Sequence, residues 1–416
     1  MTAATGRGSR LHRVVTPALL FVLALPATGC IQGHRALKAS HERHNDAIQA
    51  RINEEMLLNL VRLRYRDTPM FLRVGSVVTQ FGFNAAAGAS AGLNQNGPDS
   101  LGLNAGVGVS EEPTFTFTPL QDNEFVERLL TPIDLDVLVL LQRSGWSLDR
   151  VLRLTVQGMS GLGNAGSASG PTPARAPDYE AFGRVSRALR ALQVDRLIEI
   201  GFESRDAEIS TSLSDDNVSG SDLVAAARAG YRFAPADDGK LVLTGPARSV
   251  VLRVPDSART RAEFRELAEL LGLEATASQY EIVASDANLP ESLPPAGQRR
   301  SIAVSTRSLL GTLFYLAQTV EVPDEHYERG LVTRTIEADG RAFDWYDVAG
   351  DLMLVRSQED YPRDAAVRVR YRGHWYFIDD ADLESKSTFA LLIQLLSLQS
   401  GATTGGTPVL TLPVGG

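Results

Sequence analysis

Two segments alternate strictly between apolar residues and small or polar ones. Residues 81–94 and 101–110 follow a two-residue period, and residues 95–100 between them have the composition of a turn. The odd-numbered positions are Phe81, Phe83, Ala85, Ala87, Ala89, Ala91, Leu93, Leu101, Leu103, Ala105, Val107 and Val109. The even-numbered positions are glycine, alanine, or the polar residues Asn84, Ser90, Asn94, Asn104 and Ser110. Because side chains alternate between the two faces of a strand, this pattern predicts an amphipathic β-hairpin within about residues 74–118.

Each arm of this hairpin is long enough to cross a bilayer, since a membrane strand needs about 9–11 alternating residues. No charged residue lies between Arg73 and Asp99, or between Asp99 and Glu111. Two strands cannot cross alone, because unpaired backbone edges are costly in lipid. We therefore expect several subunits to donate hairpins to one transmembrane β-barrel, with odd positions facing the membrane and polar even positions facing the lumen. Two alternatives stay open, a hairpin packed on protein and a flexible excursion of the chain.

The N-terminus has the features of a secretion signal that ends at the sole cysteine, Cys30. A basic stretch precedes the apolar run 14–25, and small residues stand directly before the cysteine. This arrangement resembles a bacterial lipobox, which implies removal of residues 1–29 and acylation of Cys30 by lipid chains such as palmitate. Residues 30–44 would then be a lipidated tether. Ile31 favours the outer membrane, so we expect a lipid-anchored, mostly periplasmic protein.

Helical and strand patterns are mixed along the rest of the chain, which predicts an α+β fold. The expected segments are a helical region 45–160 with the inserted hairpin, a Gly/Ser/Pro linker 161–177, and α+β domains 178–288 and 298–416. The expected elements include helices 45–65, 305–320 and 383–398, a helical pattern over 122–159, and strands 240–244, 249–254, 279–284 and 409–412. The helix over 383–398 is apolar nearly all round, which predicts burial on two sides, by the same subunit and by another domain or subunit.

Three stretches carry a family resemblance: Glu55–Leu72, Pro113–Ile133 and His374–Leu396. They resemble a family of uncharacterised Gram-negative outer-membrane lipoproteins, and the likeness extends over most of the chain after the signal. It implies the compartment and the lipid anchor, and it implies no activity. In layout, but not in sequence motifs, the chain resembles oligomeric lipoprotein channels such as the curli secretion pore.

No motif in the sequence predicts an enzyme. Residues 161–166 fit the GxGxxG pattern, but they follow a helical pattern instead of a strand, so the context of a dinucleotide-binding loop is missing. His41 and His44 lie in the tether. His326 and His374 lack a Gly-x-Ser-x-Gly elbow that would make either of them a hydrolase base. We therefore predict no catalytic residues, no cofactor and no metal site.

Three other clusters are interpreted as structural. They are the acids Asp379, Asp380, Asp382 and Glu384 as helix-capping groups, the arginines Arg62, Arg64 and Arg66 as ion-pairing groups with lipid phosphate as the alternative, and Trp375–Phe377 as core packing. The net charge of −9 disfavours nucleic acid as a partner.

These features lead to one functional expectation and one alternative. We expect an outer-membrane lipoprotein subunit of an oligomeric channel or secretion complex, in which each subunit adds a hairpin to a shared barrel. Its partners would be membrane lipid through acylated Cys30, other copies of the chain, and envelope proteins. The alternative is a non-channel periplasmic scaffold, an accessory subunit of an envelope complex.

Overall fold

The computed structural model describes residues 45–92, 100–208, 218–235, 240–285, 294–400 and 410–413. The chain divides into two compact units, Met1–Glu55 and Met56–Gly416. A helix over residues 45–64 confirms the prediction for 45–65. Among the described residues, no helix is long and apolar enough to cross a membrane.

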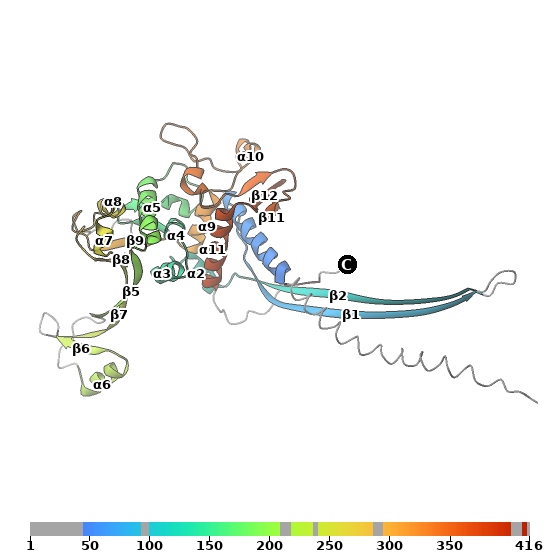
Figure 1. Cartoon of the computed structure of the whole chain (residues 1–416), viewed down its shortest axis with the longest axis horizontal. Helices are drawn as coiled ribbons and strands as arrows, with labels where there is room; N and C mark the ends of the chain where they lie inside the picture. Colours follow the sequence, from blue (N-terminus) through green and yellow to red (C-terminus); the bar gives the residue numbers. More distant parts are fainter. Residues whose placement is uncertain are drawn as a thin grey trace, which may run out of the picture. The chain divides into compact units, whose positions relative to one another are not determined.

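The elements follow in chain order, and Figure 1 labels most of them. They are β1 Leu72–Gly92, β2 Ser100–Pro119, α2 Asn123–Leu130, α3 Leu135–Arg143, α4 Leu148–Thr155, β3 Val156–Met159, β4 Leu162–Gly163, the 3-10 turn η1 Gly166–Ser169, α5 Glu180–Val194, β5 Glu199–Glu208, α6 Gly220–Arg228, β6 Arg232–Pro235, β7 Leu241–Arg253, α7 Asp256–Arg259, α8 Ala262–Leu271, β8 Gln279–Ala284, β9 Ser301–Thr306, α9 Leu309–Ala317, α10 Asp324–Glu328, the π turn η3 Tyr346–Gly350, β10 Arg356–Gln358, β11 Ala365–Tyr371, β12 His374–Asp379, α11 Leu383–Ser400 and β13 Leu410–Pro413.

The largest sheet is mixed, with strand order β4-β3-β9-β8-β7-β5 and β6 paired to β7. Its neighbouring strands are antiparallel except for the parallel pair β8–β9. Helices α5 and α8 contact each other, and α4 contacts α5. The architecture confirms the predicted α+β class. The separation into domains 178–288 and 298–416 stays a prediction, although strands from both segments share this sheet.

Strand β7 corrects the expectation of two strands over 240–244 and 249–254. It runs without a break through Gly245 and Pro246. Pro246 pairs with Asp206 of β5, and on its other side it lies between the part of β7 that pairs with β6 and the part that pairs with β8. Because proline has no N–H to donate, a strand tolerates it where no neighbour needs that donor.

The helical pattern predicted over 122–159 is also corrected at its end. Helix α4 ends at Thr155, and Val156–Met159 is strand β3, which pairs with β9. The same pairing shortens the helix predicted over 305–320, because Ser301–Thr306 is β9 and α9 begins only at Leu309. A tertiary contact therefore overrides the local helical pattern at both places.

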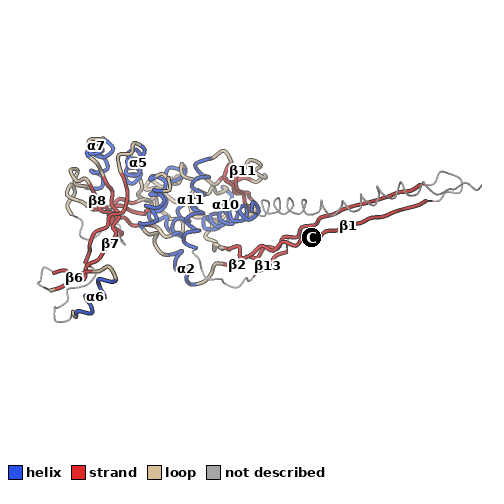
Figure 2. Tube along the Cα trace, turned by 60° about the horizontal axis from the view of Figure 1, so that its bottom comes forward, coloured by secondary structure: helices blue, strands red, loops and turns tan. Residues whose placement is uncertain are grey.

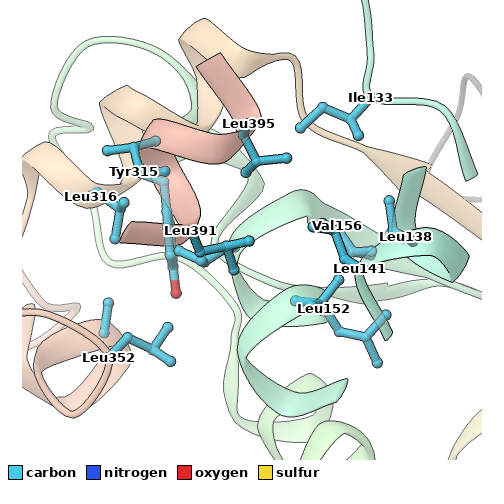
Figure 3. Close-up of a cluster of buried hydrophobic side chains, with 14 of the residues drawn as sticks. Ile133, Leu138, Leu141, Leu152, Val156, Tyr315, Leu316, Leu352, Leu391 and Leu395 are labelled. Carbon is cyan, nitrogen blue, oxygen red and sulfur yellow. The ribbon is translucent and has the colours of Figure 1, made fainter. Parts of the chain in front are cut away.

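The apolar core contains side chains from α3, α4, α9 and α11 (Figure 3). In the close-up, Tyr315 and Leu316 of α9 lie near Leu391 and Leu395 of α11. Each of these four side chains is fully buried. A second, antiparallel sheet has the order β10-β12-β11.

Helix α11 is buried along one side by the described part of the chain. Phe389, Leu391, Leu392 and Leu395 are buried, but Gln394 is exposed and Leu398 is 56% exposed. Burial of the second side by another subunit stays a prediction. The start of α11 is capped as expected, since Asp382 accepts a hydrogen bond from the backbone N–H of Ser385 at 3.0 Å.

Candidate functional site

The hairpin is a continuous antiparallel ladder. Strands β1 and β2 pair from Leu72↔Pro119 to Gly92↔Ser100 and run side by side in both views (Figures 1 and 2). Between Ser76↔Thr116 and the tip, every odd-numbered residue of β1 pairs with an odd-numbered residue of β2. This register places the two apolar sets on one face of the hairpin and the small and polar sets on the other.

The register also pairs most of the alanines of β1 with larger residues of β2. The pairs on the odd face are Phe83↔Val109, Ala85↔Val107, Ala87↔Ala105, Ala89↔Leu103 and Ala91↔Leu101. The pairs on the even face are Gly82↔Ser110, Asn84↔Gly108, Ala86↔Gly106, Gly88↔Asn104, Ser90↔Gly102 and Gly92↔Ser100. The odd face is therefore more apolar as a pair of strands than β1 is alone, and no charged residue stands on either face in these pairs.

A bulge near the base of β1 keeps the apolar face continuous. The register shifts between Val74 and Ser76, so Gly75 is the extra residue. On the base side of the bulge, Val74 pairs with Phe117. Val74 therefore lies on the face that carries the odd residues of β2.

Strand β13 pairs with β2 at the base of the hairpin. Its residues Leu410 and Leu412 pair with Phe117 and Phe115, beside β2 (Figure 2). The sheet order is β1-β2-β13, so the strand predicted over 409–412 joins the hairpin sheet. Within the described residues, the outer edge of β1 and the edge of β2 over residues 100–113 pair with no further strand.

Part of the predicted site lies outside the described residues. This holds for the lipidation residue Cys30, for His41 and His44 of the tether, and for Leu93 and Asn94 near the hairpin tip. The other predicted hairpin residues all stand at the register positions given above. Their exposure to lipid or to a lumen stays a prediction.

Apart from the hairpin, a buried polar cluster lies where the helix over residues 45–64 ends. The sequence did not indicate this cluster. Arg64 is 3% exposed and donates hydrogen bonds to Thr172 at 2.9 Å, Gln318 at 3.1 Å and Tyr327 at 2.9 Å. Burial lowers the pKa of this guanidinium, and the Tyr327 hydroxyl partly offsets that effect. The expected roles in ion pairing or lipid contact are therefore wrong for Arg64, because its partners are neutral side chains of the same chain, of which Thr172 and Gln318 are buried.

Tyr65 connects this cluster to a pair of histidines. Its hydroxyl lies 2.6 Å from His326 Nδ1 and 2.6 Å from the Tyr376 hydroxyl. Burial raises the pKa of Tyr65 and of Tyr376, so both stay protonated at neutral pH. The His326 and His374 rings are 5.1 Å apart in an edge-to-face arrangement. Burial, followed by the charge of His374, lowers the pKa of His326, which favours a neutral imidazole.

The carboxylate of Glu325 completes the cluster. Its Oε1 lies 3.3 Å from His326 Nε2 and 3.9 Å from His374 Nδ1. Among the described residues, these three form the group of side chains that could hold a metal ion. The sequence predicts no metal site. His326 and His374 are far apart in the sequence, and the fold of α10 and β12 brings them together.

The segment 161–177 lines a cleft of about 1130 Å³. The GxGxxG motif follows strand β3: Gly161 lies in the turn to β4, Gly163 ends β4 and Gly166 begins the 3-10 turn η1. Within this described segment, no α-helix begins at the motif, so the dinucleotide interpretation finds no support. The charged lining residues are Arg175, Asp178, Glu180 and Glu337. Burial and then nearby carboxylates, Asp347 first, raise the pKa of Tyr179, which indicates a negative potential at this wall. Such a cleft disfavours phosphate ligands.

Two other clusters match their structural interpretation. Tyr376 and Phe377 are buried, and Trp375 packs edge-to-face on Tyr361 with ring centroids 5.1 Å apart. Asp380 pairs with Lys386 at 2.6 Å, beside the Asp382 cap of α11.

The described residues thus define an α+β protein with a long, two-faced β-hairpin and a buried histidine pair. Comparison with protein-family models, curated proteins and solved structures gives no match.

Proposed function

We propose that this chain is an outer-membrane lipoprotein that assembles with copies of itself, each subunit inserting its β1–β2 hairpin into a shared transmembrane β-barrel. The observation that carries the proposal is the register, in which odd residues pair with odd residues from Phe83↔Val109 to Ala91↔Leu101. A shift of one residue would mix the apolar and polar sets on both faces. The observed pairing keeps one face of both strands apolar, as a membrane strand requires.

The length of the uncharged part supports the same function. The uncharged ladder from Gly82↔Ser110 to Gly92↔Ser100 spans about 33 Å at about 3.3 Å per residue. A strand tilt of about 45° reduces this to about 23 Å along the membrane normal, close to the apolar band of about 25 Å in outer-membrane barrels. Glu111 and Glu112 mark the lower limit of the uncharged part, as expected where a strand leaves the lipid.

The unpaired edges explain why several subunits are needed. The outer edge of β1 and the edge of β2 over residues 100–113 both end the sheet within the described residues. Pairing one edge to the opposite edge of the next copy repeats head to tail, and such a contact closes into a ring when the rotation allows it. A closed ring leaves no backbone edge in lipid. The activity of the ring would be passage or export of a substrate.

Two adjacent alanines provide a matched test. Ala87 pairs with Ala105 on the odd face, and Ala86 pairs with Gly106 on the even face. An Ala87→Arg substitution places a charge in lipid at mid-membrane, which costs about 2–4 kcal/mol per subunit. An Ala86→Arg substitution places the same charge in a water-filled lumen. We expect Ala87→Arg to abolish membrane-inserted oligomers and Ala86→Arg to retain them.

The measurement is the particle mass in detergent together with protection of the hairpin from protease in outer-membrane vesicles. If both variants assemble like the wild-type chain, the hairpin does not contact lipid. The scaffold alternative, with the hairpin as a protein-contact element, would then replace the channel.

A further inference from the structure

Two buried ring nitrogens of the histidine pair have no hydrogen-bond partner. His326 is fully buried and His374 is 8% exposed. Among the described side chains, His326 Nε2 and His374 Nδ1 are buried nitrogens without such a partner. Unpaired buried polar atoms are rare in folded proteins and require an explanation, such as an ion.

Both nitrogens lie near one carboxylate oxygen. Glu325 Oε1 is 3.3 Å from His326 Nε2 and 3.9 Å from His374 Nδ1, and the three atoms all lie within 4.8 Å of one another. Metal–ligand bonds of about 2.0–2.2 Å place the ligand atoms of a tetrahedral zinc site roughly 3.4 Å apart. We propose that Glu325 Oε1, His326 Nε2 and His374 Nδ1 bind a divalent transition-metal ion of the zinc class.

The exposure of the three proposed ligand side chains fits this site. The Glu325 side chain is 57% exposed, so it can close the longer distance by a rotation, whereas the two imidazoles are held in the core. Imidazole nitrogen suits zinc, copper and nickel better than it suits calcium or magnesium, which prefer oxygen ligands. Three protein ligands leave one position of a tetrahedral ion for water on the exposed side of Glu325.

Hydrogen-bond partners that can orient the His326 ring are already in place. Metal-bound histidines almost always hydrogen-bond through their other ring nitrogen, which fixes the tautomer and the ring orientation. His326 Nδ1 lies 2.6 Å from the Tyr65 hydroxyl, and Tyr65 lies 2.6 Å from Tyr376. With the ion bound to Nε2, Nδ1–H donates to the Tyr65 oxygen, and the Tyr65 hydroxyl donates to the oxygen of Tyr376.

The ion would join elements that are distant in sequence. Glu325 and His326 belong to the five-residue helix α10, and His374 begins strand β12. A five-residue helix is too short to be stable alone. The bound metal would thus link α10 to the sheet β10-β12-β11, beside the end of the helix over residues 45–64.

The experiment is a titration of the metal-stripped, full-length, detergent-solubilised chain, freed of any affinity tag, with Zn²⁺ against a competing chromogenic chelator. Glu325→Gln and His374→Gln each remove one ligand. Glu328→Gln removes the same charge from the same helix without touching the site. We expect one Zn²⁺ per chain, affinity at least about tenfold lower in both ligand variants, and unchanged affinity in the control.

A variant of the hydrogen-bond partner Tyr65 and a folding check complete the design. Tyr65→Phe removes the hydroxyl partner of His326 and is expected to weaken Zn²⁺ binding by about 10–100-fold while leaving the stoichiometry unchanged. Circular dichroism reports whether each variant folds. Because Glu325 is exposed, Glu325→Gln keeps the test valid if His374→Gln unfolds. Equal affinity in the wild-type, Glu325→Gln and Glu328→Gln chains, or no bound Zn²⁺ in the wild-type chain, would overturn the proposal.

Discussion

The guanidinium of Arg307 holds the junction at which helix α4 becomes strand β3. Arg307 is 1% exposed, and its Nη1 donates to the carbonyl oxygens of Arg153 at 3.0 Å, Leu154 at 3.2 Å and Val156 at 2.6 Å. Its Nη2 donates to the carbonyl of Asn164. The carbonyls of Arg153 and Leu154 belong to the last turn of α4, where the helix leaves them without a partner in its own backbone. We predict that Arg307→Met destabilises the fold at this junction.

The size of the destabilisation by Arg307→Met depends on which carbonyl groups keep a hydrogen-bond partner. The Asn164 side chain still donates to the carbonyls of Arg153 and Val156, at 3.0 and 2.6 Å. The carbonyl of Asn164 and that of Leu154, which keeps only a 3.4 Å hydrogen bond from Thr312 Oγ1, therefore carry most of the loss, about 1–3 kcal/mol each. Burial disfavours the guanidinium and lowers its pKa to about 10, so removing it recovers part of this cost. We expect the free energy of unfolding to fall by about 2–4 kcal/mol.

The assay is urea unfolding followed by circular dichroism, with hydrogen exchange at residues 156–159 as a local readout. Arg307→Lys keeps the charge but lacks the planar fork of donors, so we expect it to be destabilised nearly as much. The control is Arg261→Met, which removes an exposed arginine that pairs with Asp195 at 2.9 Å. Equal stability of the Arg307→Met and Arg261→Met chains would refute the reasoning, as would unchanged exchange in β3.

Two further predictions concern other polar contacts. Asn59 is fully buried and hydrogen-bonds to both the N–H and the carbonyl of Met70, at 2.9 and 2.6 Å, so Asn59→Leu should lower the free energy of unfolding by about 1–2 kcal/mol, measured by urea titration. Hydrogen bonds from Arg300 and then Thr276 lower the pKa of Glu274 from 4.5 to about 2. Its stabilisation is therefore present above pH 4.5 and is lost as the pH falls towards 2, so the deficit of Glu274→Gln against the wild-type chain should shrink over that range in thermal unfolding. A deficit that stays constant with pH would show that the Glu274 charge contributes nothing.

Local periodicity predicted the elements whose pattern lies within a single segment of the sequence. The helix over residues 45–64, strand β8 over Gln279–Ala284 and the hairpin arms all appear where the patterns place them. In the hairpin, the alternation of apolar and small or polar residues limits the register to pairings of odd with odd positions. The structure adopts one of these registers. The bulge at Gly75 was not predicted, because a single glycine in a strand pattern does not show which partner residue it will oppose.

The misplaced boundaries depend on contacts between distant segments. Nothing near Val156 ends a helix, and the donor that stabilises the junction, Arg307, is far along the chain. The same limit applies to the histidine cluster. His326 and His374 were considered singly, and their proximity to Glu325 and Tyr65 depends on how α10 packs against β12.

The two-residue period of the hairpin restricts how its length can change. Inserting one residue into the middle of an arm turns over every residue between that point and the tip, so the apolar and polar sets exchange faces. Adding two residues to each arm keeps the faces and lengthens the ladder by about 7 Å. Related chains adapted to thicker or thinner membranes should therefore differ by even steps, and an odd step should occur together with a second bulge like the one at Gly75.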